Sequence, residues 1–524
     1  MLAAAVLSLC LGADPIDADY VVRGATLYDG TGKPGAVGDL AIKGKRIVAV
    51  GAFETKGKPK VIDGKGLVAA PGFIDLHTHS DIGIFVPGSE MPIAEAKTRS
   101  NLNYLMQGVT TIVTGNCGFG PVDVGAYLKK LDEGKIGTNV AALVPHNDLR
   151  RSVMGNVNRA PTATELAKMK ALVEQGMKDG AWGMSTGLMY TPGSYARTEE
   201  VIELAKVVAA HRGFYASHMR DEGTGLLASI EETLTVGREA KVPVHISHLK
   251  ARGRKSWGKA ADALALIERA RSKGQAVTAD QYPYDAASTY LAAVAIPAVY
   301  REGGSKELFA RLDDAEQGPK VRKGIAELLA DLDGGKALMI SSYKDRSWQG
   351  KRLTEIAEKE KKSVVDLVID VERNGGATVV IFGMSDEDVR LIAKSPFVAT
   401  ASDGSANYPS DSATHPRSYG TFPRRVGRFA VADKLLPLEQ AIRSASGLPA
   451  DILRLPERGY LKAGHYADVV VFDPKTFRDT ATFAKPHQYA KGVRYLFVNG
   501  VLTIDEGKYT EALAGVTLRH RGKE

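Results

Sequence analysis

Short apolar runs alternate with longer amphipathic stretches over most of the chain, and this alternation predicts repeated strand and helix units. Helical segments of about 10 to 20 residues fit between several of the runs. Because eight such units close into a (β/α)8 barrel, we expect an α/β fold of the TIM-barrel type, with functional residues at the carboxyl ends of the strands. The eight runs are residues 72–79, 109–117, 139–147, 182–188, 213–220, 242–250, 275–284 and 397–404.

One predicted helix carries complete signals at both ends. Residues 162–180 begin with Thr162 as a helix N-cap and place Glu165 three residues later, which is the spacing of a capping box. Gly180 follows the last apolar position and should end the helix.

The stretch between the seventh and eighth runs is too long for a single crossover connection. It contains a charged, helix-like segment at 305–333 and strand-like runs at 336–343 and 378–383. We therefore expect an inserted subdomain or lid over residues 290–377.

Both ends of the chain consist of short β-type runs broken by Gly, Asp and Lys, as in residues 20–51, 458–473 and 493–505. With 524 residues the chain also exceeds what one hydrophobic core usually supports. Because these two β-rich ends flank a middle of different pattern, we expect them to meet in one small β-domain. The predicted division is a β-domain at 19–70 and 440–524, a barrel at 71–289 and 378–439, and the insertion at 290–377.

The charge of the chain and the distribution of its basic residues limit the classes of molecule that it is expected to bind. The net charge of +8 either suits anionic small molecules or aids solubility. Lys and Arg are scattered and lack interleaved aromatic residues, so we expect no nucleic-acid binding. Nothing in the pattern favours a particular oligomeric state.

The first residues, MLAAAVLSLCLG, form an apolar segment too short to span a bilayer, so no membrane span is expected. They resemble the apolar region of a secretory signal within residues 1–18, which predicts an exported, periplasmic protein; without such a signal the protein would be cytoplasmic. Cys10 lies in this segment, and Cys117 is the other cysteine, so no disulfide framework is expected.

Metal-binding residue types gather at the predicted strand ends. His77 and His79 are two residues apart in GFIDLHTHSD, and side chains at i and i+2 lie on the same face of a strand. Each residue alone could be a packing or turn residue, but six at the same rim of one barrel indicate chemistry. The six are His77, His79, Cys117, His218, His248 and Asp403.

These residue types suit zinc, which binds imidazole and thiolate and keeps one position open in catalytic sites. Cys117, His218 and His248 supply three ligands, and His77 and His79 could hold a second ion with the thiolate as a bridge. Asp403 would then take a proton from metal-bound water, whose pKa falls to about 7 on zinc.

The chain resembles the amidohydrolase superfamily and, within it, the D-aminoacylase (N-acyl-D-amino-acid deacylase) group. The resemblance covers nearly the whole chain from about Tyr20, and the Cys-containing turn and the HPR…GTFPR segment are its most specific parts. It rests on PGFIDLHTHSD (71–81), GVTTIVTGNCGFG (108–120), GMSTGLMYTPG (183–193), YASHMRDEG (215–223), VHISHLK (244–250), DQYPYDAAST (280–289), TASDG (400–404) and THPRSYGTFPR (414–424).

The resemblance implies a barrel beside a β-sandwich built from both termini, with a smaller insertion. It implies one tightly held zinc on Cys117, His218 and His248, a weaker second site at His77 and His79, and Asp403 as general acid and base. It also implies zinc-dependent hydrolysis of small-molecule N-acyl-D-amino acids. Substrate carboxylate contacts map onto Lys250, Tyr282, Ser288 and Arg417, and Arg220, just past a strand end, is a further candidate for anionic substrate groups.

Three alternatives remain open. The first is a cyclic amidase of the same superfamily. Many of these enzymes bridge two metals with a carboxylated lysine on the fourth strand. The fourth predicted strand of this chain, in 182-WGMSTGLMY-190, has no lysine, which argues against this alternative. A relative acting on dipeptides and a non-catalytic metal-binding sensor on the same scaffold are the other two.

Overall fold

The computed structural model describes residues 14–81, 92–410 and 414–522. Its centre is a barrel of parallel strands, in which each neighbour in the chain is also a neighbour in space. The third strand is interrupted at Leu143 and so counts as two short segments. The barrel strands are β8 (Phe73–Asp75), β9 (Val109–Thr114), β10 (Asn139–Ala142) with β11 (Val144–Pro145), β12 (Gly183–Gly187), β13 (Phe214–His218), β14 (Val244–Ile246), β15 (Val277–Gln281) and β19 (Val398–Thr400).

The barrel closes between the last strand and the first. Thr78 pairs in parallel with Gly404. The amide of Asp403 donates to the carbonyl of His77 at 2.8 Å. Each of the eight predicted runs contains one of these strands, so the expected barrel is confirmed. This closure brings the segments that follow β8 and β19 side by side at the rim.

Helices surround the barrel because the strands are buried on both faces and need apolar cover. The helix predicted at 162–180 is α4 (Ala163–Lys178), and its capping box is present: Thr162 accepts from the amide of Glu165, and Glu165 accepts from the amide of Thr162. The other covering helices include α2 (Val124–Gly134), α3 (His146–Met154), α5 (Thr198–Ala210), α6 (Leu226–Ala240), α7 (Ala260–Ser272), α13 (Asp386–Ala393), α15 (Leu438–Ala445) and α16 (Gly447–Leu453).

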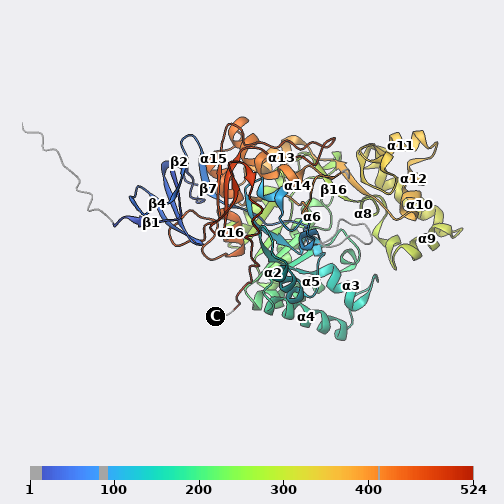
Figure 1. Cartoon of the computed structure of the whole chain (residues 1–524). Coiled ribbons are helices and arrows are strands. Elements are labelled where there is room, and N and C mark those ends of the chain that lie inside the picture. The colour runs from blue at the N-terminus through green and yellow to red at the C-terminus, as the bar shows by residue number, and fades with distance from the viewer. Residues whose placement is uncertain (1–13, 82–91, 411–413, 523–524) are drawn as a thin grey trace, which may run out of the picture.

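Strands from both ends of the chain form one nine-stranded sheet. This sheet lies beside the barrel (Figure 1). Its core joins residues far apart in the sequence, such as Val22, Leu40, Val469 and Phe497. The fold is therefore a TIM barrel with a β-sandwich domain made from the two termini. The sheet contains β2 (Tyr20–Leu27), β3 (Ala36–Lys43), β4 (Arg46–Gly51), β6 (Lys60–Asp63), β7 (Val68–Pro71), β20 (Val469–Phe472), β21 (Val493–Val498), β22 (Val501–Asp505) and β23 (Lys508–Tyr509).

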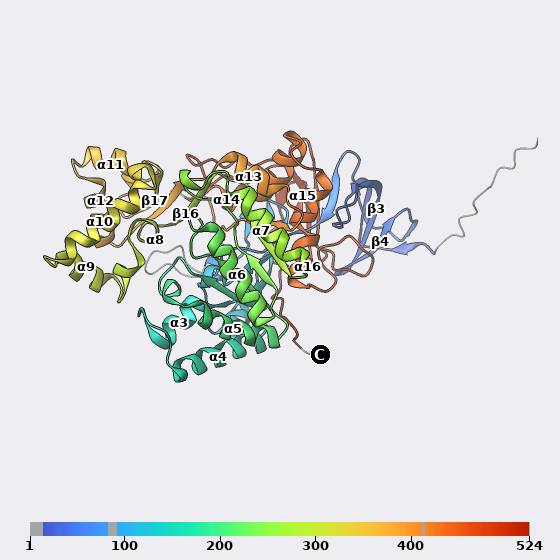
Figure 2. The same cartoon turned by 180° about the vertical axis from the view of Figure 1, so that it is seen from behind.

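A smaller unit lies at the opposite end of the molecule from the β-sandwich, where Figures 1 and 2 draw it mainly in yellow. Its helices pack beside an antiparallel three-stranded sheet in the order β16, β18, β17. The residue limits set for the three units from the sequence stay a prediction. The elements are β16 (Ala286–Tyr290), α8 (Leu291–Ala295), α9 (Ser305–Asp313), α10 (Gln317–Ala330), β17 (Leu338–Ser342), α11 (Leu353–Lys359), α12 (Val364–Arg373) and β18 (Thr378–Phe382).

The end of the chain returns to the barrel. The amide of Leu518 donates to the carbonyl of Val140 at 2.7 Å, and Trp182 Nε1 donates to the carbonyl of Leu518 at 2.7 Å. Residues 1–13 of the predicted secretory signal lie outside the described residues, and export stays a prediction. Among the helices described, none combines the length and the apolar character needed to cross a membrane.

Candidate metal centre

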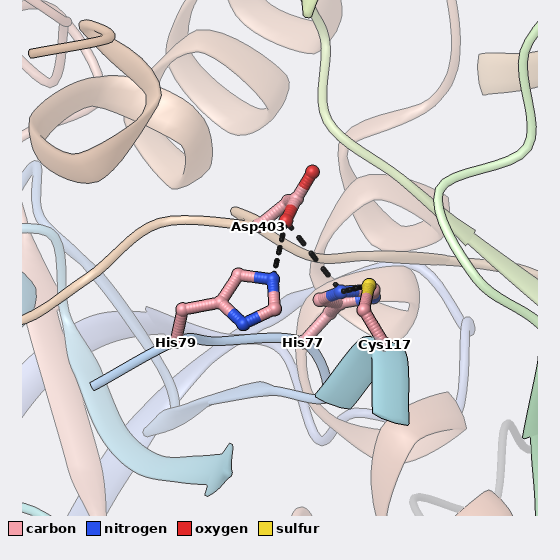
Figure 3. A group of neighbouring side chains, drawn as sticks. All are labelled: His77, His79, Cys117 and Asp403. Carbon is pink, nitrogen blue, oxygen red and sulfur yellow. Dashed lines mark hydrogen bonds and ion pairs between the residues drawn. The ribbon is translucent and has the colours of Figure 1, made fainter. Parts of the chain in front are cut away.

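Two histidines and one aspartate face one another where the first and last barrel strands end. His77 and His79 follow β8, and Asp403 follows β19. Nε2 of His79 lies 3.1 Å from Oδ1 of Asp403, and Nε2 of His77 lies 3.5 Å from the same oxygen. Figure 3 shows both rings turned toward this carboxylate. The His-Thr-His spacing therefore places both imidazole rings on the same side of the chain, as the alternation of side chains along a strand predicted.

Cys117 lies in a tight turn, Asn116–Gly118, directly after β9. The turn is held from both sides: the amide of Gly115 donates to Asp81 at 2.7 Å, and the amide of Gly118 donates to Ser185 at 2.9 Å. The side chain is buried, with 2% of its surface exposed. The turn therefore holds the thiol of Cys117 in place at the rim formed by the carboxyl ends of the barrel strands.

The sulfur of Cys117 contacts histidines on both sides. It lies 3.2 Å from Nε2 of His77, 3.3 Å from Nδ1 of His218 and 3.5 Å from Nε2 of His248. His218 ends β13, and His248 follows β14. The structure thus brings together all six predicted chemical residues, in two groups that share Cys117. The groups are His77, His79, Cys117 and Asp403, and Cys117, His218 and His248.

These groups fit zinc. A tetrahedral zinc with a sulfur ligand at about 2.3 Å and a nitrogen ligand at about 2.0 Å places the two ligand atoms about 3.5 Å apart. The distances from the sulfur to His218 and His248, 3.3 and 3.5 Å, are close to this value. Three protein donors of soft and borderline type leave room for water or substrate, as in catalytic zinc sites.

Three residues of the centre have left-handed backbone conformations, which are unusual for residues other than glycine. The φ angles are 53° for Cys117, 35° for His248 and 51° for Asp403. Such conformations persist where the surrounding structure demands them, and they concentrate at functional sites.

Electrostatics favours the ionised forms of Asp403 and Cys117. Burial would raise the pKa of Asp403, but the charges of Arg417 and of the neighbouring histidines hold the pKa well below its ordinary value. Burial also opposes ionisation of Cys117, yet His77 and His218 lower the pKa of the thiol well below its usual range. A thiolate and a carboxylate are the forms that bind metal or accept a proton.

Four of the five predicted substrate-binding residues lie together beside Asp403. Arg417 forms an ion pair with Oδ2 of Asp403 at 2.8 Å, and its guanidinium lies 4.9 Å from the ring centre of Tyr282. The ammonium of Lys250 lies 5.5 Å from the same ring. The carbonyl of Ser288 accepts from Arg417 at 3.4 Å. Two cations and one phenol ring therefore lie together next to the metal groups.

Arg220 is placed differently. Its guanidinium forms an ion pair with Glu232 on α6 at 2.9 Å and donates to the carbonyls of Ser194 and Ala196. These three partners occupy most of the hydrogen-bond donors of the guanidinium and indicate a structural role. Its role with the substrate stays a prediction that these contacts do not favour.

The sequence reasoning missed two buried carboxylates. Oδ2 of Asp280, on β15, lies 3.4 Å from Nδ1 of His77 and 2.8 Å from Nε2 of His245. Glu222 contacts both His248 and Lys250. A signal was present for Asp280, since an acidic residue at the end of a barrel strand points to the rim, but Glu222 lies in a loop and had none.

Comparisons with known proteins point to one family. The model of the "Amidohydrolase family" matches residues 60–315 and 375–504. A D-aminoacylase of Alcaligenes xylosoxydans xylosoxydans is 36% identical over 95% of this chain and 97% of its own length.

Two solved structures are similar over 96% of this chain and 100% of their own, each with a TM-score of 0.80. One is a D-aminoacylase described as having a binuclear metal centre, with one-metal activation and second-metal attenuation, and is 34% identical. The other is an N-acyl-D-glutamate deacylase of Bordetella bronchiseptica in complex with zinc and a phosphonate inhibitor, and is 30% identical.

Proposed function

The chain belongs to the amidohydrolase family, and from this premise we infer that it is a zinc-dependent deacylase of N-acyl-D-amino acids. The observation that carries the inference is the pair of groups of potential metal ligands that share Cys117, one of which includes Asp403. The products are a carboxylate and a free D-amino acid.

Zinc, when bound, polarises the acyl carbonyl of the substrate and lowers the pKa of the attacking water. Cys117, His218 and His248 would hold the tight ion, and His77 and His79 would hold the weaker one with Cys117 shared. The donor set and the spacing of the ligand atoms support this assignment.

Asp403 accepts the proton of the attacking water and then donates it to the departing amine, which is general base and general acid catalysis by one group. Its geometry supports both steps, because Oδ1 faces the histidines while Oδ2 is fixed by Arg417. The low pKa of Asp403 keeps the carboxylate ionised, so it is ready to act as the base.

Arg417 and Lys250 bind the α-carboxylate of the substrate by charge-assisted hydrogen bonds, and both cations lie over the ring of Tyr282. The hydroxyl of Tyr282 is buried and has no hydrogen-bond partner among the described residues. A substrate carboxylate would supply that partner. The rest of the substrate can enter a neighbouring cavity of about 280 Å³, which is lined by Tyr190, whose ring centre lies 4.7 Å from that of His218.

The test is the release of amine from matched N-acetyl-D- and N-acetyl-L-amino acids by zinc-loaded protein. Release from the D-series alone supports the proposal. Comparable activity on the L-series would contradict it. Silence on both series would point to a dipeptide, a cyclic amide or a sensor that binds without catalysis.

A further inference from the structure

Glu222 lies behind the metal centre, on the side away from the shared sulfur. It follows β13 by four residues and is buried, with 2% of its surface exposed. Oε1 lies 2.9 Å from Nδ1 of His248, and Oε2 lies 4.0 Å from Nε2 of His218. Each of these histidines has one ring nitrogen that faces Cys117, called the inner nitrogen, and one that faces away, called the outer nitrogen. One carboxylate therefore lies near both outer nitrogens.

Zinc on the inner nitrogen of His248 decides where the ring proton must be. The inner nitrogen is Nε2, which lies 3.5 Å from the sulfur, so a bound ion requires an unprotonated Nε2 and leaves the proton on Nδ1. Nδ1 then needs an acceptor. Glu222 is an acceptor, whereas Lys250, whose Nζ lies 2.7 Å from the same nitrogen, offers only donors.

The same reasoning applies to His218 with the two nitrogens exchanged. Nδ1 faces the sulfur at 3.3 Å, so the outer nitrogen is Nε2. Nε2 is buried and has no hydrogen-bond partner within the described part of the chain. The carboxylate of Glu222, whose Oε2 lies 4.0 Å from this nitrogen, is the acceptor toward which its proton can point.

We propose that Glu222 is the positioning residue of the tight zinc site: it accepts the outer ring protons of His218 and His248 and thereby fixes both rings in the tautomers that bind zinc. The proposal rests on the zinc site of the proposed function. A partner of this kind orients a ligand histidine and strengthens it as a donor.

The same carboxylate links the metal to the substrate contacts. Glu222 also pairs with Lys250, so the lysine is held by Glu222 rather than by the histidine ring once Nδ1 of His248 carries its proton. Loss of the carboxylate should therefore weaken zinc retention and also displace a group expected to bind the substrate carboxylate.

The experiment compares zinc-loaded wild-type protein with Glu222→Gln and Glu222→Asp in a titration against a chelator, with zinc per chain as the readout. Glutamine keeps the shape but has one acceptor oxygen and no charge, so it cannot serve two ring protons and Lys250 together. We expect Glu222→Gln to weaken zinc binding by about 10- to 100-fold. The shorter aspartate keeps the charge, so Glu222→Asp should restore part of the loss.

Glu200→Gln is the matched control. Glu200 is also a buried carboxylate, 3.0 Å from Nε2 of His146 and 3.1 Å from Nε of Arg150, but it contacts none of the predicted ligands. This variant should retain zinc as the wild type does. A cobalt-loaded sample of each protein adds a second readout, since the visible spectrum reports the geometry of the ligands.

Wild-type zinc affinity and an unchanged cobalt spectrum in Glu222→Gln would overturn the proposal. A weaker affinity that Glu200→Gln shows equally would also overturn it, because the loss would then come from general destabilisation. If Glu222→Gln fails to fold, Glu222→Asp decides: its zinc affinity must lie below that of the wild type. Zinc retention is measured without substrate, so a wild-type protein that binds zinc but releases no amine refutes the deacylase function and leaves this test intact.

Discussion

Replacement of Asp403 by asparagine should separate catalysis from zinc binding. Asparagine has nearly the same shape but cannot accept a proton from water at neutral pH. Loss of a general base typically costs about 10²- to 10⁴-fold in rate, which corresponds to about 3 to 5 kcal/mol in the activation barrier. Zinc on Cys117, His218 and His248 should remain, because Asp403 is not part of that group.

The same substitution should lower the stability of the folded protein. Two unit charges separated by the 2.8 Å between Arg417 and Asp403 attract by about 6 kcal/mol at an effective dielectric constant near 20. Desolvation offsets part of this attraction, and removal of one member of a buried pair usually costs about 3 to 5 kcal/mol. The side chain of Arg417 is only 7% exposed, so water cannot replace the lost partner well.

The assay measures kcat and KM for an N-acetyl-D-amino acid, zinc per chain, and the free energy of unfolding in urea. We expect a carboxylate-bearing substrate to raise the Tm of Asp403→Asn more than that of the wild type, since it gives Arg417 a new partner. Glu200→Gln serves as the control, because it also breaks a buried pair with an arginine and should lose stability without losing kcat. If Asp403→Asn retains zinc and its kcat stays within about tenfold of the wild type, Asp403 is not the general base.

Three further predictions concern other parts of the chain. Cys117→Ser removes the sulfur common to both metal groups, so zinc per chain after dialysis against a chelator should fall by more than about tenfold, and full retention would exclude Cys117 as a ligand. Burial raises the pKa of Glu372 to about 7, so the stability linked to its protonated form is present below pH 4.5 and is lost as the pH rises through 7. Glu372→Gln should therefore match the wild type near pH 4.5 and require about 2 to 3 kcal/mol more free energy to unfold at pH 8; equal urea midpoints at pH 8 would contradict this. Thr162→Ala should lower the free energy of unfolding by about 0.5 to 2 kcal/mol because the N-cap of α4 loses its acceptor, whereas Thr162→Ser should stay near the wild type in the same melts.

The sequence determined the barrel and the rim. Each strand is set by a local run of apolar residues, and repeated strand and helix units can close in few ways, so the order of the runs decided which strands are neighbours. Residues that end a strand must then lie at the same rim. For this reason the positions of His77, Cys117, His218 and Asp403 in the sequence, which are separated by up to 326 residues, were enough to predict that their side chains meet.

Which charges form pairs depends on how the elements pack. Arg220 and Glu222 lie two residues apart in one loop, yet Arg220 turns to Glu232 on α6 while Glu222 turns inward to His248. A strand has an alternation that tells one face from the other, but a loop has none, so its side chains take the directions that the surrounding elements allow. The order of residues along the chain therefore specified which side chains meet at the rim, and packing specified the partners that hold them in place.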